Sequence, residues 1–311
     1  MRLSFIIPCY KSEKTVSGVI NEIVSVISEK SDYDYEIITV NDSSPDKVYD
    51  ILVDIAKNNN KVKVVDLARN VGKHAALMAG FSIAQGDYII CLDDDGQCPI
   101  DELWNLIEPL NNGYDMAVAK YPKKKQSVKK NFGSAINSAM TRILLEKPKD
   151  WVFSNFVARK KFVCDEIIKY QNPYPYLEGL SLKVTRKIAF VPMEEREREI
   201  GQSGYTLKKS ISLWFNGFTS FSVKPLRISS FIGFLTALIG FLFGICTIIR
   251  KLVVVNISIG WSSTIAIMLF IGGTIMLMLG MLGEYIGRVY ISINNSPQYV
   301  IRDIISFNDL R

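Results

Sequence analysis

The sequence has few of the residues that build disulfides, zinc sites or catalytic triads. Its 311 residues include five cysteines and a single histidine. No two cysteines form a CxxC pair, and Cys246 lies inside a long apolar run, so we predict neither a disulfide framework nor a zinc site. Because His74 has no serine or cysteine with evident partners, we interpret it as a residue at a helix start and leave open its distance from a site.

Other absences exclude further classes of site and partner. Gly72–Lys73 is not a P-loop, because no glycine stands five residues before Gly72 and His74 replaces the required serine or threonine. The sequence has no repeated unit and no aromatic–basic pattern, so we expect no nucleic-acid partner. We also expect no signal peptide, because the first apolar run, Leu3–Ile7, ends at Pro8 and is typical of a strand.

Two long charge-free runs occupy the C-terminal third of the chain. Residues 229–249 and 256–283 contain no Asp, Glu, Lys or Arg. Since roughly 20 apolar residues cross a bilayer core as a helix, we predict transmembrane helices at about 229–249 and 262–283. Few basic residues, Arg250 and Lys251, lie between them, whereas more flank the pair, so both ends are predicted in the cytoplasm. The net charge of +6 is compatible with anionic lipids and phosphorylated substrates.

The first part of the chain has the pattern of an α/β domain, in which short β-branched runs alternate with amphipathic segments. We predict strands at Leu3–Ile7, Glu36–Val40, Val62–Asp66, Tyr88–Leu92 and Met116–Ala119. We predict helices at Val16–Ser28, Lys47–Asn58, His74–Ala84 and Ile100–Leu110. This alternation predicts a mostly parallel sheet covered on both faces, with a ligand crevice at the carboxyl ends of its strands.

Polar side chains follow four of the predicted strands. Tyr10 follows the first, Asp42 the second, Lys73 the third and three carboxylates the fourth. A ring, acids and cations at one edge are what a nucleotide needs for stacking, hydrogen bonding and phosphate binding. Residues 41–46 are also typical of an Asx turn that leads into a helix.

The acidic triplet Asp93, Asp94 and Asp95 is the most informative feature. It ends an apolar run, and crowded carboxylates repel one another unless a cation lies among them. Hard oxygen ligands suit Mg²⁺ or Mn²⁺, which commonly hold a substrate diphosphate. A solvated acidic turn is the alternative interpretation.

Seven segments, in order, resemble the motifs of a known family. Ser4–Tyr10, Glu36–Asp46, Arg69–Lys73 and Asp93–Gln97 are similar to those of family 2 glycosyltransferases of GT-A fold. Three later segments resemble the polyprenyl-phosphate glycosyltransferases, which include dolichol-phosphate mannose synthase and bactoprenol-phosphate glucosyltransferases: Gly201–Tyr205, Phe218–Arg227 and Gly280–Arg288.

The resemblance implies a Rossmann-like GT-A domain and an inverting transfer of a hexose from a nucleotide sugar to a polyprenyl (undecaprenyl) phosphate. The implied metal ligands for Mg²⁺ or Mn²⁺ are Asp93, Asp95 and Gln97. The implied nucleotide-sugar residues are Pro8, Tyr10, Glu13, Asp42, Asn70, Lys73 and Asp94. The implied acceptor-phosphate residues are Arg196, Arg198 and Ser203, and the implied catalytic residues are Asp93, Asp95 and Arg198. A UDP-sugar donor is favoured and GDP-mannose is possible, whereas the sugar itself stays open.

Several positions depart from the family pattern. Lys11 and Ser12 stand where Asn-Glu is usual, which leaves Glu13 as a substitute acid. Many relatives carry an acidic Asp-Phe-Arg near residue 155, but this chain has Phe153-Ser154-Asn155. The resemblance therefore implies no general base at this position. A phosphate acceptor, whose second pKa is about 6, is mostly dianionic and needs no such base.

These inferences give a layout of four parts. We expect a glycosyltransferase domain at 1–205, juxtamembrane amphipathic helices at 206–228, two transmembrane helices within 229–283 and a cytoplasmic tail at 284–311. The expected protein is a multi-pass enzyme of the cell membrane with a cytoplasmic catalytic domain, acting in cell-envelope glycan modification. Glycines in the second span would permit packing against another helix in a homo-oligomer. A processive polysaccharide synthase and a non-catalytic membrane scaffold are the alternatives.

Overall fold

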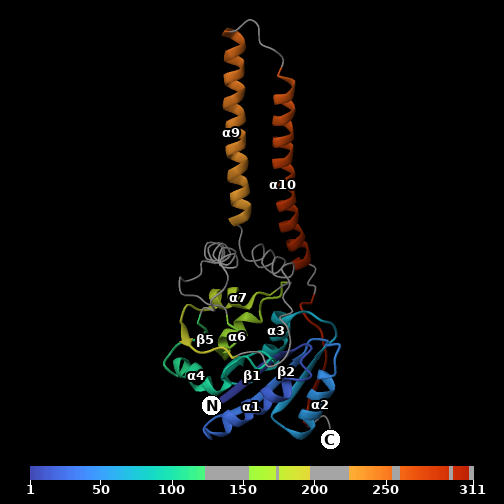
Figure 1. The fold of residues 1–311 in the computed structure, drawn as a ribbon, viewed down its shortest axis with the longest axis vertical. Helices are drawn as coiled ribbons and strands as arrows, with labels where there is room; N and C mark the ends of the chain where they lie inside the picture. The colour runs from blue at the N-terminus through green and yellow to red at the C-terminus, as the bar shows by residue number, and fades with distance from the viewer. Residues whose placement is uncertain (123–153, 173–174, 197–223, 254–259, 294–296, 308–311) are drawn as a thin grey trace. The chain divides into compact units, whose positions relative to one another are not determined.

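The computed structural model describes residues 1–122, 154–172, 175–196, 224–253, 260–293 and 297–307 (Figure 1). The chain divides into two units, Met1–Ser210 with Asn295–Arg311 and Ile211–Asn294, which we describe separately. Arg198, Ser203 and most of the segment 206–228, for which we made predictions, lie outside the described residues.

A mixed sheet forms the centre of the first unit. Within the described residues its strand order is β7-β5-β6-β4-β1-β2-β3-β8. The strands are β1 (Arg2–Cys9), β2 (Asp34–Asn41), β3 (Val62–Leu67), β4 (Tyr88–Cys91), β5 (Met116–Lys120), β6 (Val157–Lys160), β7 (Ile188–Pro192) and β8 (Ile301–Ser306). The central strands β4, β1, β2 and β3 are parallel, whereas β6 and β8 are antiparallel to their neighbours. The carboxyl ends of the four central strands therefore meet at one edge.

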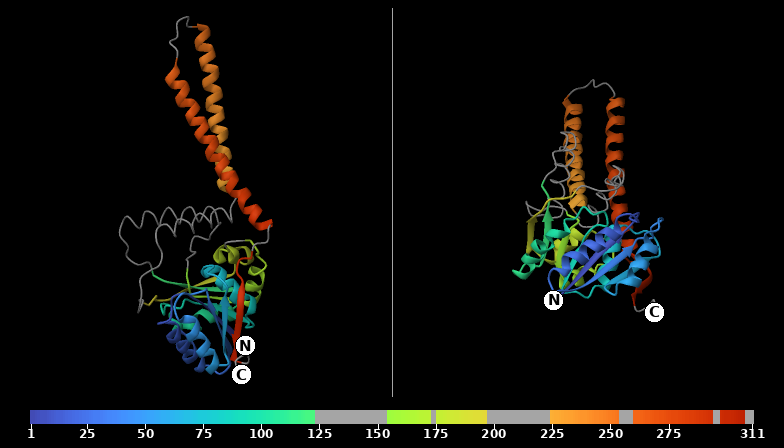
Figure 2. Two further views of the ribbon diagram at one scale, coloured as in Figure 1. Left: turned by 90° about the vertical axis from the view of Figure 1, so that its right-hand side faces the viewer. Right: turned by 60° about the horizontal axis from the view of Figure 1, so that its bottom comes forward.

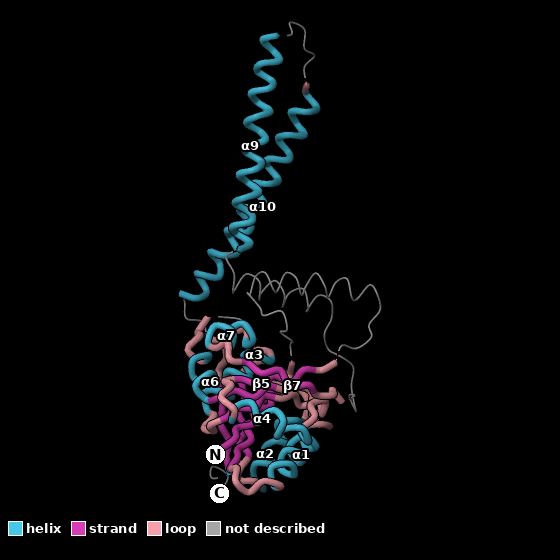
Figure 3. Tube along the Cα trace, turned by 90° about the vertical axis from the view of Figure 1, so that its left-hand side faces the viewer, coloured by secondary structure: helices cyan, strands magenta, loops and turns pink. Residues whose placement is uncertain are grey.

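Helices cover both faces of this sheet (Figure 3). One face carries α1 (Val16–Ser28), α2 (Val48–Asn58) and α4 (Leu103–Asn111), with the short 3-10 turn η1 (Ile100–Glu102) before α4. The other face carries α3 (Lys73–Ile83), α6 (Lys161–Ile167) and α7 (Leu177–Val184). Successive strand residues point to opposite faces, so Leu3, Phe5 and Ile7 enter the core under α1, whereas Ile6 faces α3.

Helix α3 lies unusually close to β1. A Cβ atom on Gly80 would stand 2.3 Å from Cγ2 of Ile6, which no side chain can tolerate without a shift. Glycine is therefore needed for this close approach. The approach fixes the helix, and with it Lys73 at its first residue, against the central strands.

A buried carboxylate joins the strands near their amino ends. Glu36 is 1% exposed and accepts hydrogen bonds from Ser4 Oγ (2.6 Å), Gln85 N (2.7 Å), Lys63 Nζ (2.9 Å) and Arg2 (3.1 Å). Burial raises the pKa of Glu36, but these donors outweigh burial and leave the pKa below its usual value.

The predicted α/β alternation is confirmed. Each of the five predicted strands and four predicted helices is present, with ends that shift by a few residues. The sequence did not predict β6, β7 or β8. Strand β8 comes from the segment expected to be a tail, and it pairs antiparallel with β3 (Figure 2). Arg302 strengthens this pairing by donating to Asp66 Oδ2 and to the Ala68 carbonyl, both at 3.1 Å.

The second unit contains two long helices, α9 (Lys224–Val253) and α10 (Trp261–Ile293). Their large apolar side chains are unusually exposed, with Phe241 at 67% and Met276 at 72%. Among the described residues, one segment, Phe270–Gly287 of α10, is long and apolar enough to cross a membrane. Helix α9 contains a shorter apolar segment, Gly233–Cys246. The prediction of two membrane-spanning helices is therefore not confirmed by this structure alone.

Candidate active site

The candidate site lies where the order of the parallel strands reverses. β2 and β3 follow on one side of β1, while β4 returns to its other side. Ligands of open α/β sheets bind at such switch points, beyond the carboxyl ends of the strands. Tyr10 follows β1, and its backbone N–H donates to Asp94 Oδ2 at 3.1 Å, which joins the two loops. Tyr10 is 45% exposed and Lys11 Nζ lies 5.5 Å from the centre of its ring, so the ring is accessible to a planar ligand beside a cation.

Asp42 anchors the neighbouring loop. It is 3% exposed, and its two carboxylate oxygens accept from the backbone N–H groups of Val71 (2.7 Å) and Gly72 (2.9 Å). Its carbonyl oxygen also accepts from Asn70 Nδ2 at 3.0 Å. Burial raises the pKa of Asp42, and the two backbone donors oppose this increase. Asp42 and Asn70, predicted as nucleotide-sugar residues, thus hold the turn that begins α3.

That turn places Lys73 beside Asp93 of the acidic triplet. Gly72 has a φ of 85°, a left-handed conformation that favours glycine, and α3 begins at the next residue. Lys73 Nζ forms an ion pair with Asp93 Oδ1, and Asn155 Nδ2 donates to Asp93 Oδ2 at 3.0 Å. Burial lowers the pKa of Lys73, but the Asp93 charge more than offsets this effect and raises it. Both oxygens of Asp93 are thus bound by donors.

The other two acids have different surroundings. Burial, aided by the Asp93 charge, raises the pKa of Asp94 to about 6, although the hydrogen bond from the Tyr10 backbone N–H opposes this increase. Asp95 Oδ1 accepts from the backbone N–H of Gln97 at 3.2 Å. These contacts hold the triplet in one tight turn.

Gln97 is tied to Arg196. The Gln97 side chain is buried and donates through Nε2 to the Arg196 carbonyl at 3.2 Å, while Arg196 N donates to the Gln97 carbonyl at 3.1 Å. The Arg196 guanidinium pairs with Glu22 at 2.8 Å and also with Asp101. Burial lowers the Arg196 pKa, but the two carboxylates raise it overall. In this structure Arg196 binds carboxylates, although we predicted an acceptor phosphate as its partner.

The acidic turn fits a divalent cation with few protein ligands. The described residues contain no group of three or more His, Cys, Asp and Glu arranged for a metal. Asp93 and Asp95 nevertheless supply hard oxygens, and the Lys73 ammonium already stands against Asp93 as a cation. Mg²⁺ and Mn²⁺ sites commonly use one or two carboxylates and take their other ligands from water and substrate phosphates. The donor set is consistent with that kind of site.

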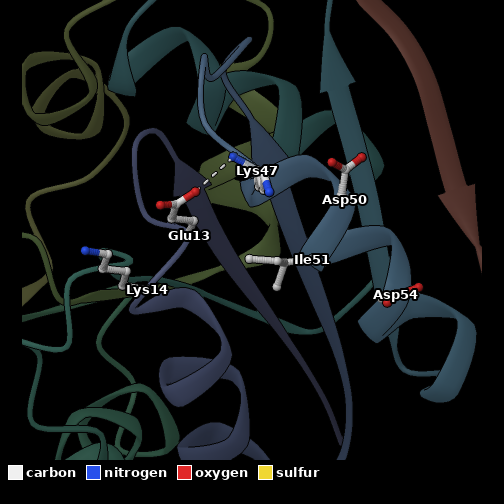
Figure 4. A pocket seen from close by; sticks show the side chains of 6 residues that line it. All are labelled: Glu13, Lys14, Lys47, Asp50, Ile51 and Asp54. Atoms are coloured by element: carbon white, nitrogen blue, oxygen red, sulfur yellow. Dashed lines mark hydrogen bonds between the residues drawn. The ribbon is translucent and has the colours of Figure 1, made fainter.

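Two predicted residues lie outside this group. Pro8 is part of β1, paired with Val40. Glu13 lies in a surface cavity of about 390 Å³ between the starts of α1 and α2, lined also by Lys14, Lys47, Asp50, Ile51 and Asp54 (Figure 4). There Glu13 Oε2 accepts from Lys47 N at 3.2 Å, and Glu13 N donates to Asp46 Oδ2 at 3.0 Å. These contacts stabilise the start of α2, and the cavity contains none of the acidic triplet.

The sequence did not single out Glu178, which faces His74. Glu178 lies in the first turn of α7, and its Oε2 atom stands 4.0 Å from Nδ1 of His74, the second residue of α3. Burial lowers the pKa of His74, and so do the charges of Lys73 and Arg159, whereas Glu178 opposes the decrease. A lone glutamate in the apolar stretch Tyr176–Leu180 was the available signal.

Comparison with known families shows two matches that follow one another along the chain. The model described as "Glycosyl transferase family 2" matches residues 4–168, and the model described as "GtrB C-terminal hairpin" matches residues 224–289. Both are in the order that the sequence motifs predicted.

Individual proteins match over nearly the full length. The SfII prophage-derived bactoprenol glucosyl transferase of Shigella flexneri is 32% identical, with 97% of this chain and 98% of that protein covered. The undecaprenyl-phosphate 4-deoxy-4-formamido-L-arabinose transferase of Photorhabdus laumondii is 29% identical, with 99% and 95% covered.

Among solved structures, the fold is similar to glucosyl-3-phosphoglycerate synthase of Mycobacterium tuberculosis in complex with Mn²⁺ and uridine-diphosphate-glucose. The TM-score is 0.53 at 16% identity, with 70% of this chain and 77% of that chain covered. This likeness shows a fold of the GT-A kind.

Proposed function

The chain belongs to glycosyl transferase family 2, and from that premise we propose that it transfers a sugar from a nucleotide-sugar donor to a polyprenyl phosphate. The observation that carries the proposal is the near full-length similarity to two transferases named for bactoprenol and undecaprenyl phosphate. The proposed product is a polyprenyl-phosphate sugar. The processive synthase and scaffold alternatives gain no support from these relatives.

The donor is proposed to bind at the edge formed by the ends of β1 and β4. Tyr10 would stack on the base, while Lys73 would neutralise the diphosphate. A UDP-sugar is favoured, because the solved structure of similar fold was obtained with uridine-diphosphate-glucose. We propose a hexose as the transferred sugar, in an inverting reaction.

Asp93 and Asp95, with Gln97, would hold the Mg²⁺ or Mn²⁺ ion. When bound, such an ion stabilises the negative charge of a departing nucleoside diphosphate. The acceptor phosphate is mostly a dianion at pH 7, since its second pKa is about 6, and so it attacks without losing a proton. This chemistry agrees with Asn155 beside Asp93, because an amide cannot serve as a general base.

The acceptor is proposed to come from the bilayer. Helices α9 and α10 expose large apolar side chains, including Phe231 (62%) and Phe270 (65%), as lipid-facing helices do. Together with the hairpin match over residues 224–289, this exposure supports two membrane spans and a cytoplasmic catalytic domain. Anchoring would raise the local concentration of a lipid phosphate at the site.

The test is transfer of labelled sugar to lipid in membranes that contain the full chain. The double variant Asp93→Ala with Asp95→Ala should lose at least about 100-fold in rate, because the transition-state charge loses its stabilisation. Asp54→Ala, an exposed acid on α2, is the matched control and should transfer normally. Sugar transfer retained by the double variant would reject the metal assignment, and no transfer by the wild-type protein from any nucleotide sugar would reject the function.

A further inference from the structure

Two buried polar atoms beside the candidate site have no hydrogen-bond partner. They are Nδ1 of His74 and Oε2 of Glu178, atoms of the described part of the chain that are themselves buried although their side chains are 22% and 19% exposed and so border on solvent. Their separation of 4.0 Å is too long for a hydrogen bond between them. Buried polar atoms are rarely left unpaired, because losing water without a replacement costs free energy.

The position of this pair relates it to the donor diphosphate. His74 follows Lys73, whose ammonium pairs with Asp93. Glu178 opens α7 on the same face of the sheet as α3, and its charge acts on both Lys73 and His74. In a nucleotide sugar the sugar is bonded to the terminal phosphate. A diphosphate held at Lys73 would therefore bring the sugar ring close to His74 and Glu178.

The chemistry of the pair suits a hydroxyl group. An ionised carboxylate only accepts hydrogen bonds, whereas an imidazole nitrogen either donates or accepts. A hydroxyl oxygen about 2.8 Å from each atom would bridge the 4.0 Å gap and donate its proton to Glu178. The nearby ring of Tyr176, edge-on to His74 at 5.9 Å, gives the pair an apolar wall.

We propose that Glu178 and His74 form a subsite that binds one hydroxyl group of the donor sugar and contributes to sugar specificity. This inference rests on the proposed function. The two relatives compared above are named for glucose and for a substituted arabinose, so residues other than the family motifs must distinguish sugars. A water molecule bridging the same two atoms in a purely structural role is the competing explanation.

The experiment uses the full chain in membranes. A panel of UDP-hexoses first identifies the donor that the wild-type protein uses, and monodeoxy analogues of that donor are then compared in the wild type, in Glu178→Gln and in His74→Phe. Loss of a hydrogen bond to a charged group corresponds to about 10- to 100-fold in kcat/KM. The variants should show this loss with the full donor, and little further loss with the one deoxy analogue that lacks the bridged hydroxyl. UDP binding by calorimetry should stay unchanged.

Glu166→Gln, an exposed acid on α6, is the matched control and should behave as wild type. Two results would overturn the subsite and favour a bridging water. One is a variant whose kcat/KM falls below that of the wild type by the same factor with every deoxy analogue, and the other is a variant whose kcat/KM with the full donor does not fall. If Glu178→Gln does not fold, His74→Phe alone decides between these outcomes, because it removes the same bridge from the other side. A wild-type protein that transfers no sugar would instead indicate failure of the proposed function.

Discussion

Replacing Lys73 by methionine should change metal and nucleotide binding in opposite directions. In this structure the Lys73 ammonium pairs with Asp93, the carboxylate proposed to bind the metal. The substitution removes a cation that competes with the metal for Asp93. It also removes a cation that the donor diphosphate would use. Metal binding without nucleotide should therefore become tighter, and UDP binding weaker.

The magnitude follows from the environment of the pair. Two unit charges in contact attract by about 4 kcal/mol at an effective dielectric constant of about 20. The Lys73 and Asp93 side chains are 36% and 22% exposed, so solvent screens this attraction, and partly exposed pairs contribute about 1 kcal/mol or less. A change of about 1 kcal/mol corresponds to about fivefold in affinity. We therefore expect Mn²⁺ to bind about fivefold tighter and UDP at least about fivefold weaker.

Both affinities are measurable on the detergent-solubilised full chain. Electron paramagnetic resonance reports free Mn²⁺, and calorimetry reports UDP binding at saturating metal. Lys61→Met is the matched control, since it removes an exposed pair with Asp34 (2.5 Å) at the amino end of the strands. Unchanged or weaker Mn²⁺ binding in a folded Lys73→Met protein would refute the idea that lysine and metal compete for Asp93.

Three further changes test the surrounding structure. Asn155→Asp places a second carboxylate against Asp93, so it should raise Mn²⁺ affinity and lower the melting temperature without metal, and a gain in stability would contradict this account. The pKa of Glu36 in the folded protein lies below its usual value of 4.5. The ionised Glu36 therefore stabilises the fold above that pH, and this stabilisation is lost as the pH falls through the folded-state pKa. Glu36→Gln should therefore unfold more easily at neutral pH and lose less stability between pH 7 and 3, as followed by circular dichroism; parallel pH curves would exclude the network as the cause. Deleting residues 297–311 exposes the edge of β3, so the variant should be cleaved faster by protease and tend to aggregate, whereas wild-type resistance would show that β8 contributes nothing.

The central strands could be predicted because they are buried on both faces. Tyr88–Leu92 is a continuous apolar run, and Leu3–Ile7 is one interrupted only by Ser4, which is the expected pattern for parallel strands between two helical layers. Strands β6 and β8 each pair with a strand far away in the sequence, so local pattern does not indicate their partners. In residues 301–306, apolar and polar residues do not alternate regularly, and the segment follows a long apolar helix. The local sequence pattern therefore did not predict a strand of the sheet there.

The candidate site was only partly predictable for a related reason. Parallel strands end at a common edge, so the grouping of Tyr10, Lys73 and Asp93 follows from topology alone. Which side chains then form pairs depends on loops that fold over one another. Neither the capture of Asp42 by backbone amides nor the pairing of Arg196 with Glu22 follows from residue spacing.

The Lys73–Asp93 pair also bears on how such a site can remain charged without its ligands. A partly buried carboxylate or ammonium alone would tend towards its neutral form, because burial disfavours charge. The Asp93 charge raises the pKa of Lys73 despite burial, so the Lys73 ammonium stays charged and ready to bind an anion. Binding of a metal–nucleotide complex would then replace the Lys73–Asp93 ion pair by two others, in which Asp93 binds the metal and Lys73 binds the diphosphate. Such an exchange adds little net Coulomb energy, so selectivity between donors must come from neutral groups of the nucleoside and the sugar, which are the groups that Tyr10 and the Glu178–His74 pair are proposed to bind.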